Sequence, residues 1–146
     1  MITDQNPESL DVFDALPPLR EVIAAHGLRA EKALGQNFLL DANITNKIVR
    51  QIGNIAQKNI IEIGPGPGGL TRSLLRAGAK SVTAIEFDSR AVAALSDLSS
   101  IAQGRLQIIE ADALKTNLLT LVPAPRVIAA NLPYNIATPL LIGWLA

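Results

Sequence analysis

The sequence has 146 residues, enough for one domain with a single core. Apolar residues make up 49% and charged residues 18%, which is typical of a globular chain and excludes a disordered one. The formal net charge is zero, which argues against a strongly basic nucleic-acid-binding surface and leaves room only for a local patch.

Cysteine is absent from the sequence, so neither a disulfide framework nor thiolate chemistry is expected. The first fourteen residues lack the basic and apolar regions of a signal peptide, and no apolar run is long enough to span a membrane. We therefore expect a cytoplasmic protein with neither a membrane nor a metal among its partners.

The N-terminal part combines a loose segment with helices. Residues 1–16 are polar and are predicted to be flexible. Prolines at the start and Gly27 at the end predict a helix over 17–27. Residues 28–40 have no clear period and predict a loop.

A second helix is predicted over residues 41–56. Either Asp41 or Asn43 can cap its N-terminus. Its apolar face is formed by residues at helical spacing, which are Ile44, Ile48, Val49 and Ile52.

From residue 59 onward the hydrophobic period changes to that of buried strands. Four short runs are rich in β-branched residues, at 59–64, 81–87, 106–111 and 126–131. Helical patterns separate the first three of them, at 69–79 and 89–104. Strands alternating with helices predict a parallel α/β sheet, and we assign residues 17–146 to one Rossmann-like domain.

A glycine-rich loop follows the first predicted strand and opens a helix. Gly64, Gly66 and Gly69 fit the pattern G-x-G-x-x-G, in which glycine lets a ligand approach the backbone. Glu86 ends the next strand, 20 residues after Gly66, where an acid can accept both hydroxyls of a ribose. The pattern predicts a site for a nucleoside-containing cofactor.

The loop and Glu86 leave two cofactors open, because NAD and S-adenosylmethionine both carry a free ribose. Pro65 and Pro67 remove two N–H donors from the loop, which favours a ligand without phosphate and hence S-adenosylmethionine. A glycine turn that only lets helix and strand pack remains the structural alternative.

Asp112 ends the third strand at the same predicted edge of the sheet. Its carboxylate can accept a hydrogen bond from an adenine amino group, since ligands of open α/β sheets bind at the carboxyl ends of strands. Taken alone, Asp112 is equally well explained as the N-cap of a following helix.

Residues 131–134, which we call the base clamp, follow the fourth strand. Asn131 and the carbonyl of Leu132 can accept the two hydrogens of an adenine N6 amine, and Pro133 fixes the backbone between them. Tyr134 offers a flat face on which a base can stack. The alternative is a turn in which proline ends the strand and tyrosine fills a surface groove.

These motifs together resemble the small-subunit ribosomal RNA adenine N6,N6-dimethyltransferases, in their N-terminal part. The resemblance covers most of the chain from Leu34 onward. It is carried by LGQNFLLD (34–41), EIGPGPGGLT (62–71), AIEFD (84–88), EADAL (110–114) and NLPYNIATPLL (131–141).

The resemblance implies transfer of four methyl groups from S-adenosylmethionine, two each to two adjacent adenosines near the 3′ end of the RNA, in an immature small subunit. It implies that Asn37 and Leu39 cover the methionine end of the cofactor. The other implied cofactor contacts are Gly64 and Gly66 by their backbone, Glu86 at the ribose, Asp112 at the adenine, and Asn131. It implies that the base clamp, Asn131 to Tyr134, acts on the target base, and it matches Glu62 to an acid common before the loop.

The resemblance also implies a seven-stranded sheet followed by a helical C-terminal domain. The chain contains only four predicted strands of that sheet and no match to the helical domain. We therefore expect a fragment that ends after the fourth strand and is inactive alone. We expect residues 126–131 to form an unpaired edge through which copies self-associate, and residues 139–146 to have lost the strands they would cover.

Three other functions stay open. A large-subunit RNA methyltransferase of the erythromycin-resistance type would share the loop and the clamp, although LGQNFLLD and NLPYNIATPLL resemble the small-subunit group more. The second is a nicotinamide-dependent oxidoreductase, in which the base clamp would have no role. A non-catalytic fragment that only binds cofactor is the third.

Overall fold

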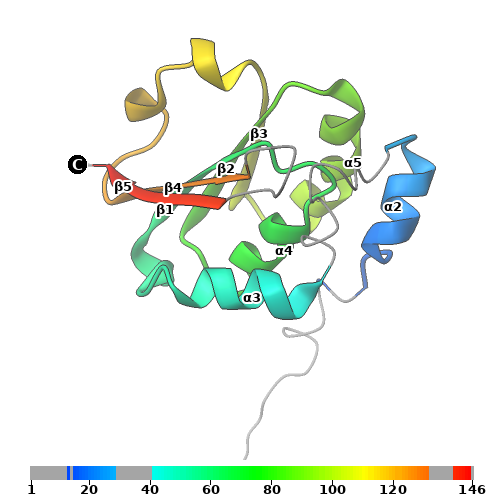
Figure 1. The fold of residues 1–146 in the computed structure, drawn as a ribbon, viewed down its shortest axis with the longest axis horizontal. Coiled ribbons are helices and arrows are strands. Elements are labelled where there is room, and N and C mark those ends of the chain that lie inside the picture. The colour runs from blue at the N-terminus through cyan, green and yellow to red at the C-terminus, as the bar shows by residue number, and fades with distance from the viewer. Residues whose placement is uncertain (1–12, 14, 29–40, 132–139, 146) are drawn as a thin grey trace, which may run out of the picture.

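The fold is built on one twisted sheet (Figure 1). A computed structural model describes residues 13, 15–28, 41–131 and 140–145. In the described part the strand order is β3-β2-β1-β4-β5. The strands are β1 (Asn59–Ile63), β2 (Ser81–Glu86), β3 (Leu106–Glu110), β4 (Arg126–Asn131) and β5 (Leu140–Leu145).

The first four strands run parallel, each pairing in register with its neighbour. Each lies within one residue of its predicted range. The predicted α/β, Rossmann-like fold is therefore confirmed.

The fifth strand corrects the sequence analysis. Residues 126–131 were expected to form an unpaired edge, but β4 pairs with β1 on one side and with β5 on the other. The pairing with β5 is antiparallel and runs from Arg126 opposite Leu145 to Asn131 opposite Leu140. A strand edge presents free N–H and C=O groups, and the last apolar residues of the chain satisfy them. The prediction of self-association through an exposed fourth strand therefore loses its basis.

The described residues also form four helices and three short 3-10 segments, some before β1 and the rest between strands. The helices are α2 (Leu19–Ala25), α3 (Ala42–Arg50), α4 (Gly69–Arg76) and α5 (Ser89–Ile101). The 3-10 segments are η3 (Ile55–Gln57), η4 (Ala113–Lys115) and η5 (Leu118–Thr120). No described helix is long and apolar enough to cross a membrane.

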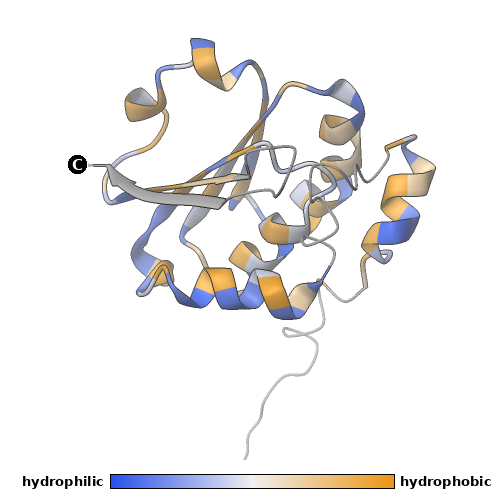
Figure 2. Ribbon diagram, in the orientation of Figure 1, coloured by the Kyte–Doolittle hydropathy of each residue, from blue (hydrophilic) through white to orange (hydrophobic). Residues whose placement is uncertain are grey.

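The second predicted helix begins as expected and ends early. Asp41 is its cap, because its side chain accepts a hydrogen bond from the backbone N–H of Asn43. The helix ends at Arg50, six residues before the predicted end, since Gly53 and Asn54 both take positive φ angles (67° and 44°) that a right-handed helix cannot contain. Figure 2 shows the amphipathic character of α3, whose apolar residues alternate with polar ones around the helix.

The main core lies between one face of the sheet and helices α3, α4 and α5. Ile60, Val82 and Val127 point into it from three neighbouring strands. Ile61 and Ile85 are buried on the opposite face, which agrees with the prediction of strands covered on both sides. Two residues of the segment expected to be loose also join the core, Phe13 and Leu16.

Candidate cofactor and base site

The glycine loop lies where β1 ends, beside the end of β2. Gly64 and Gly66 both have positive φ angles (69° and 57°), which disfavour any residue with a side chain. The N–H of Gly64 donates to the carbonyl of Ile85 at 2.9 Å, which holds the loop against β2. A Cβ atom added to Gly66 would meet nothing within 4 Å, so the loop faces open space there.

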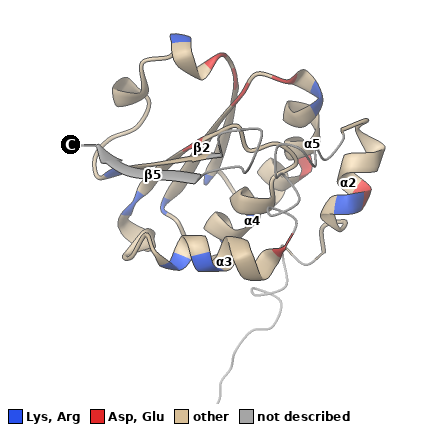
Figure 3. Ribbon diagram, viewed as in Figure 1, with Lys and Arg blue, Asp and Glu red and all other residues tan. Residues whose placement is uncertain are grey.

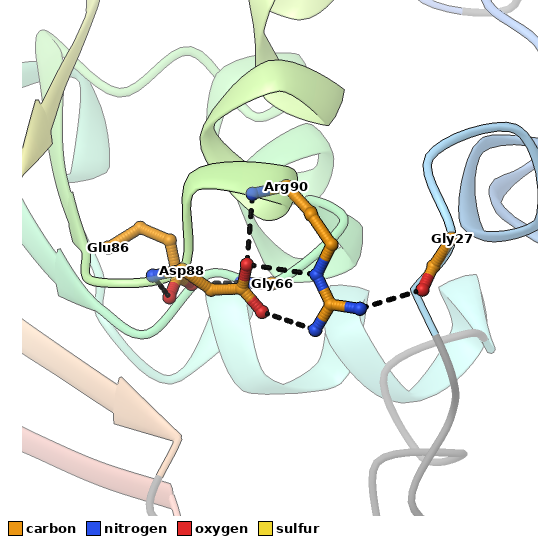
Figure 4. Close-up of polar contacts among 5 residues, drawn as sticks. All are labelled: Gly27, Gly66, Glu86, Asp88 and Arg90. Carbon is orange, nitrogen blue, oxygen red and sulfur yellow. Dashed lines mark hydrogen bonds and ion pairs between the residues drawn. The ribbon is translucent and has the colours of Figure 1, made fainter.

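Glu86 holds the loop from the end of β2. One carboxylate oxygen accepts the N–H of Gly66 at 3.0 Å, and the other accepts the N–H of Asp88 at 3.0 Å (Figure 4). A carboxylate has about four acceptor positions, so each oxygen keeps capacity for a further hydrogen bond. The sequence analysis did not anticipate this hydrogen bond between Glu86 and the glycine loop, and the remaining acceptor positions leave capacity for two hydroxyls of a ligand.

Asp112 lies on the same edge, just after β3. Glu86 is paired with Glu110 in the β2–β3 register, and the carbonyl of Glu86 accepts the N–H of Ala111 at 3.0 Å. The carboxylate of Asp112 caps η4 through a 2.9 Å bond from the N–H of Leu114. The capping role considered in the sequence analysis is therefore present, and it uses only Oδ1.

Two exposed apolar side chains flank these acids, and sequence reasoning missed them. Phe87 directly follows Glu86 and is 76% exposed, and Leu114 follows Asp112 by two residues and is 95% exposed. The sequence feature that could have identified them is a large apolar residue within two positions of an acid at the end of a strand. They give this edge apolar surface suited to a flat ring.

Gly68 has a role that the glycine motif did not include. It precedes α4 with a φ of 103°, and a Cβ there would lie 2.9 Å from Cδ2 of Leu95. Leu95 is fully buried in the core. Gly68 is therefore needed both for the turn into α4 and for close packing of α4 against α5.

Glu62 is buried beneath the loop, near the end of β1, with 2% of its surface exposed. The hydroxyl of Thr71, in the first turn of α4, donates to its Oε1 at 2.6 Å. Burial raises the pKa of Glu62 to about 7, the Thr71 hydrogen bond opposes the rise, and the nearby charge of Glu86 adds to it. Glu62 is thus an internal brace between strand and helix.

A chain of polar contacts connects the loop to the end of α2 (Figure 4). Asp88 binds Arg90 through both carboxylate oxygens, with the closest side-chain contact at 3.0 Å. Arg90 in turn donates to the carbonyl of Gly27 at 3.0 Å. The residues that precede the segment 29–40 are therefore linked to Glu86 through Arg90 and Asp88.

Several predicted site residues lie outside the described residues. They are Asn37, Leu39, Leu132, Pro133 and Tyr134. The backbone of Asn131 is described and pairs with Leu140 at the end of β4. The structure thus brings together Gly64, Gly66, Glu86 and Asp112 on one edge.

The comparison with protein families matches the description "Ribosomal RNA adenine dimethylase" over residues 27–146. The chain belongs to this family. It is 61% identical over 132 residues to "Ribosomal RNA small subunit methyltransferase A" of Rhodospirillum rubrum, covering 90% of the chain and 46% of that protein. It is 59% identical over 134 residues to the protein of the same description from Allorhizobium ampelinum, covering 91% of the chain and 49% of that protein.

The chain therefore spans about half the length of these relatives of the dimethylase family. Among solved structures, the 23S rRNA methyltransferase ErmE matches with a TM-score of 0.56 and 28% identity, over 64% of this chain and 36% of that one. An O-methyltransferase fold from Klebsiella pneumoniae matches with a TM-score of 0.54 and 22% identity, over 85% of this chain and 51% of that one. The second match supports the Rossmann-like fold alone.

Proposed function

We propose that the protein carrying this sequence transfers methyl groups from S-adenosylmethionine to N6 of two adjacent adenosines near the 3′ end of small-subunit ribosomal RNA. The proposal includes an immature small subunit as substrate and a cytoplasmic location. The observation that carries it is the meeting of Gly66, Glu86 and Asp112 on one sheet edge, in a chain of the ribosomal RNA adenine dimethylase family.

The residues on this edge fit the proposed cofactor. Glu86 keeps acceptor positions for the two ribose hydroxyls, and the open space at Gly66 allows close approach. Asp112 can accept from the adenine amino group, and Phe87 supplies an exposed apolar surface next to it. When bound, the cofactor supplies a methyl group on a positively charged sulfur.

Asn131 lies at the end of β4, next to β1 and its glycine loop. In our proposal its side chain and the Leu132 carbonyl accept the two amino hydrogens of the target adenine, which favours a more nucleophilic nitrogen. Tyr134 stacks on the base. No strong general base is needed, because the methylated nitrogen is acidic and loses its proton readily. Positioning therefore supplies most of the rate enhancement.

The test is methyl incorporation by the intact protein into immature small subunits, with large-subunit RNA as the competing substrate. We expect transfer to the small subunit and dimethyladenosine in its RNA. Tyr134→Ala should weaken base stacking by roughly 1–3 kcal/mol, while cofactor affinity stays within a few-fold. Wild-type transfer rates in Tyr134→Ala would contradict the base clamp. Transfer to large-subunit RNA alone would replace the proposed substrate by that of the ErmE-like enzymes.

A further inference from the structure

A cavity of about 240 Å³ lies where α2, α3 and α4 meet. The residues that line it are Pro18, Leu19, Ala42, Thr45, Gly69, Arg72, Ser73 and Arg76. None of these is acidic, and two are arginines. Gly69 also begins α4 directly after the glycine loop, so the cavity adjoins the proposed cofactor edge while sharing no residue with its acids.

Arg72 is the unusual member of this cavity. Its Nε is buried, and no residue in the described part of the chain accepts a hydrogen bond from it. Burial and the neighbouring charge of Arg76 both lower the pKa of Arg72. A buried donor without an acceptor and two like charges one helical turn apart both carry an energetic cost, which an anion in the cavity would relieve.

Arg105 shows how this chain treats a partly buried guanidinium that has only a structural role. Its Nε donates to the carbonyl of Ala79 at 3.1 Å, and one terminal nitrogen donates to the carbonyl of Leu75 at 2.7 Å. Those bonds satisfy the C-terminal end of α4. Among the residues that the structure describes, none accepts a hydrogen bond from Nε of Arg72.

The polar remainder of the cavity also suits an anion. The hydroxyls of Thr45 and Ser73 are 2.6 Å apart, and either can be the donor. The Thr45 hydroxyl also lies 3.2 Å from the carbonyl of Ala42, which can accept its proton. When Thr45 instead donates to Ser73, the proton of Ser73 is available to a ligand. Guanidinium groups and hydroxyls together are the typical partners of phosphate oxygens, which arginine can bind in pairs.

We propose that this cavity binds a phosphate group through Arg72, and that in the working protein the group belongs to the backbone of the RNA substrate. The second half of the inference rests on the proposed function. An RNA phosphate held beside Gly69 would fix the strand next to the methylation edge without reading its sequence, because phosphate contacts position an RNA and base contacts specify it.

The experiment compares Arg72→Gln and Arg72→Lys with a control, Arg50→Gln, in the intact protein. Arg50 is an exposed basic residue at the end of α3, outside the cavity, and its substitution removes the same charge. Figure 3 shows the basic residues along α3. RNA affinity for a single-stranded fragment of the substrate is measured between low and moderate salt. We expect Arg72→Gln to weaken binding about tenfold or more and to reduce the slope of log K against log salt by about 0.7. Arg72→Lys should keep the slope and lose part of the affinity.

Two further measurements separate the possible sources of the anion. Inorganic phosphate should raise the melting temperature of the wild type and have no effect on Arg72→Gln. S-adenosylmethionine affinity should be unchanged in all variants. If phosphate raised the melting temperature of the wild type but RNA affinity were the same in Arg72→Gln and the wild type, the cavity would bind a free phosphate ion. That result would overturn the proposed contact with RNA and leave the phosphate site standing. If the wild type bound no RNA at all, the proposed function would fail. The melting temperature with and without phosphate would still test whether the cavity binds an anion.

Two outcomes would overturn the inference itself. One is equal behaviour of Arg72→Gln and Arg50→Gln in every assay, which would make Arg72 one basic surface residue among others. The other is a loss of S-adenosylmethionine affinity in Arg72→Gln, which would assign the guanidinium to the carboxylate of the cofactor.

Discussion

The hydroxyl of Thr71 donates a 2.6 Å hydrogen bond to the buried carboxyl of Glu62, joining the first turn of α4 to β1. The glycine loop runs between these two residues, so the contact closes the base of the loop. Because both ends of the loop are braced in this way, Gly66 is held in a conformation that faces open space.

The titration of Glu62 should make folding stability depend on pH. Its pKa is raised from 4.5 to about 7 in the fold, chiefly by burial, so the folded state holds the proton more tightly than the unfolded chain. The contribution of Glu62 to the free energy of unfolding should therefore be largest below pH 4.5, fall as pH rises from about 4.5 to about 7, and level off above. The size of this contribution is about 3 kcal/mol.

Glu62→Gln should remove that fall, because a carboxamide oxygen still accepts from Thr71 and carries no charge. Urea denaturation of both proteins at several pH values between 4 and 8 measures the effect. Glu110→Gln, at an exposed acid at the end of β3, is the matched control and should keep the wild-type pH profile. Equal pH profiles for Glu62→Gln and the wild type would show that the brace does not titrate in this range.

Thr71→Val removes the donor from the same brace while keeping the side-chain shape. It leaves a buried oxygen of Glu62 without a partner, which costs about 1–3 kcal/mol of unfolding free energy. Thr71→Ser retains the hydroxyl and should recover most of that loss. Wild-type stability in Thr71→Val would show that this hydrogen bond does not stabilise the fold.

Gly68→Ala should destabilise the protein more than Gly104→Ala. Both glycines have positive φ angles (103° and 85°), so alanine strains the backbone at each, by about 1 kcal/mol or more. Only at Gly68 does the added Cβ approach another atom, 2.9 Å from the buried Leu95 side chain. Overpacking adds a further 1–3 kcal/mol or so. The difference in melting temperature between the two variants measures the cost of packing the added Cβ against Leu95. Equal melting temperatures would show that Leu95 moves aside freely.

Glu86→Ala should weaken S-adenosylmethionine binding by about 30- to 1,000-fold, since two charge-assisted hydrogen bonds to a ribose contribute roughly 2–4 kcal/mol. The substitution also releases the N–H groups of Gly66 and Asp88, so folding must be checked by circular dichroism. Titration calorimetry with Glu110→Ala as control measures the affinity. Unchanged affinity in a folded Glu86→Ala protein would remove Glu86 from the cofactor site.

The sequence alone determined the α/β class, the four parallel strands and the position of Glu86 at the end of the strand that follows the glycine loop. These features depend on local signals: the alternation of strand and helix patterns, the glycines that a sharp turn requires, and the position of an acid at the end of the next strand. The same signals placed Asp112 at the sheet edge and narrowed the cap of α3 to Asp41 or Asn43, between which the structure selects Asp41.

Only the tertiary structure decided what depends on contacts between distant parts of the chain. The last residues pair with β4 as a strand because its edge offers free backbone groups, a need that periodicity within residues 139–146 does not express. The burial of Glu62, the close approach of Gly68 to Leu95 and the unpaired Nε of Arg72 likewise arise from packing between elements. A side chain's partners across a core are set by three-dimensional proximity, which residue order in a single sequence does not record.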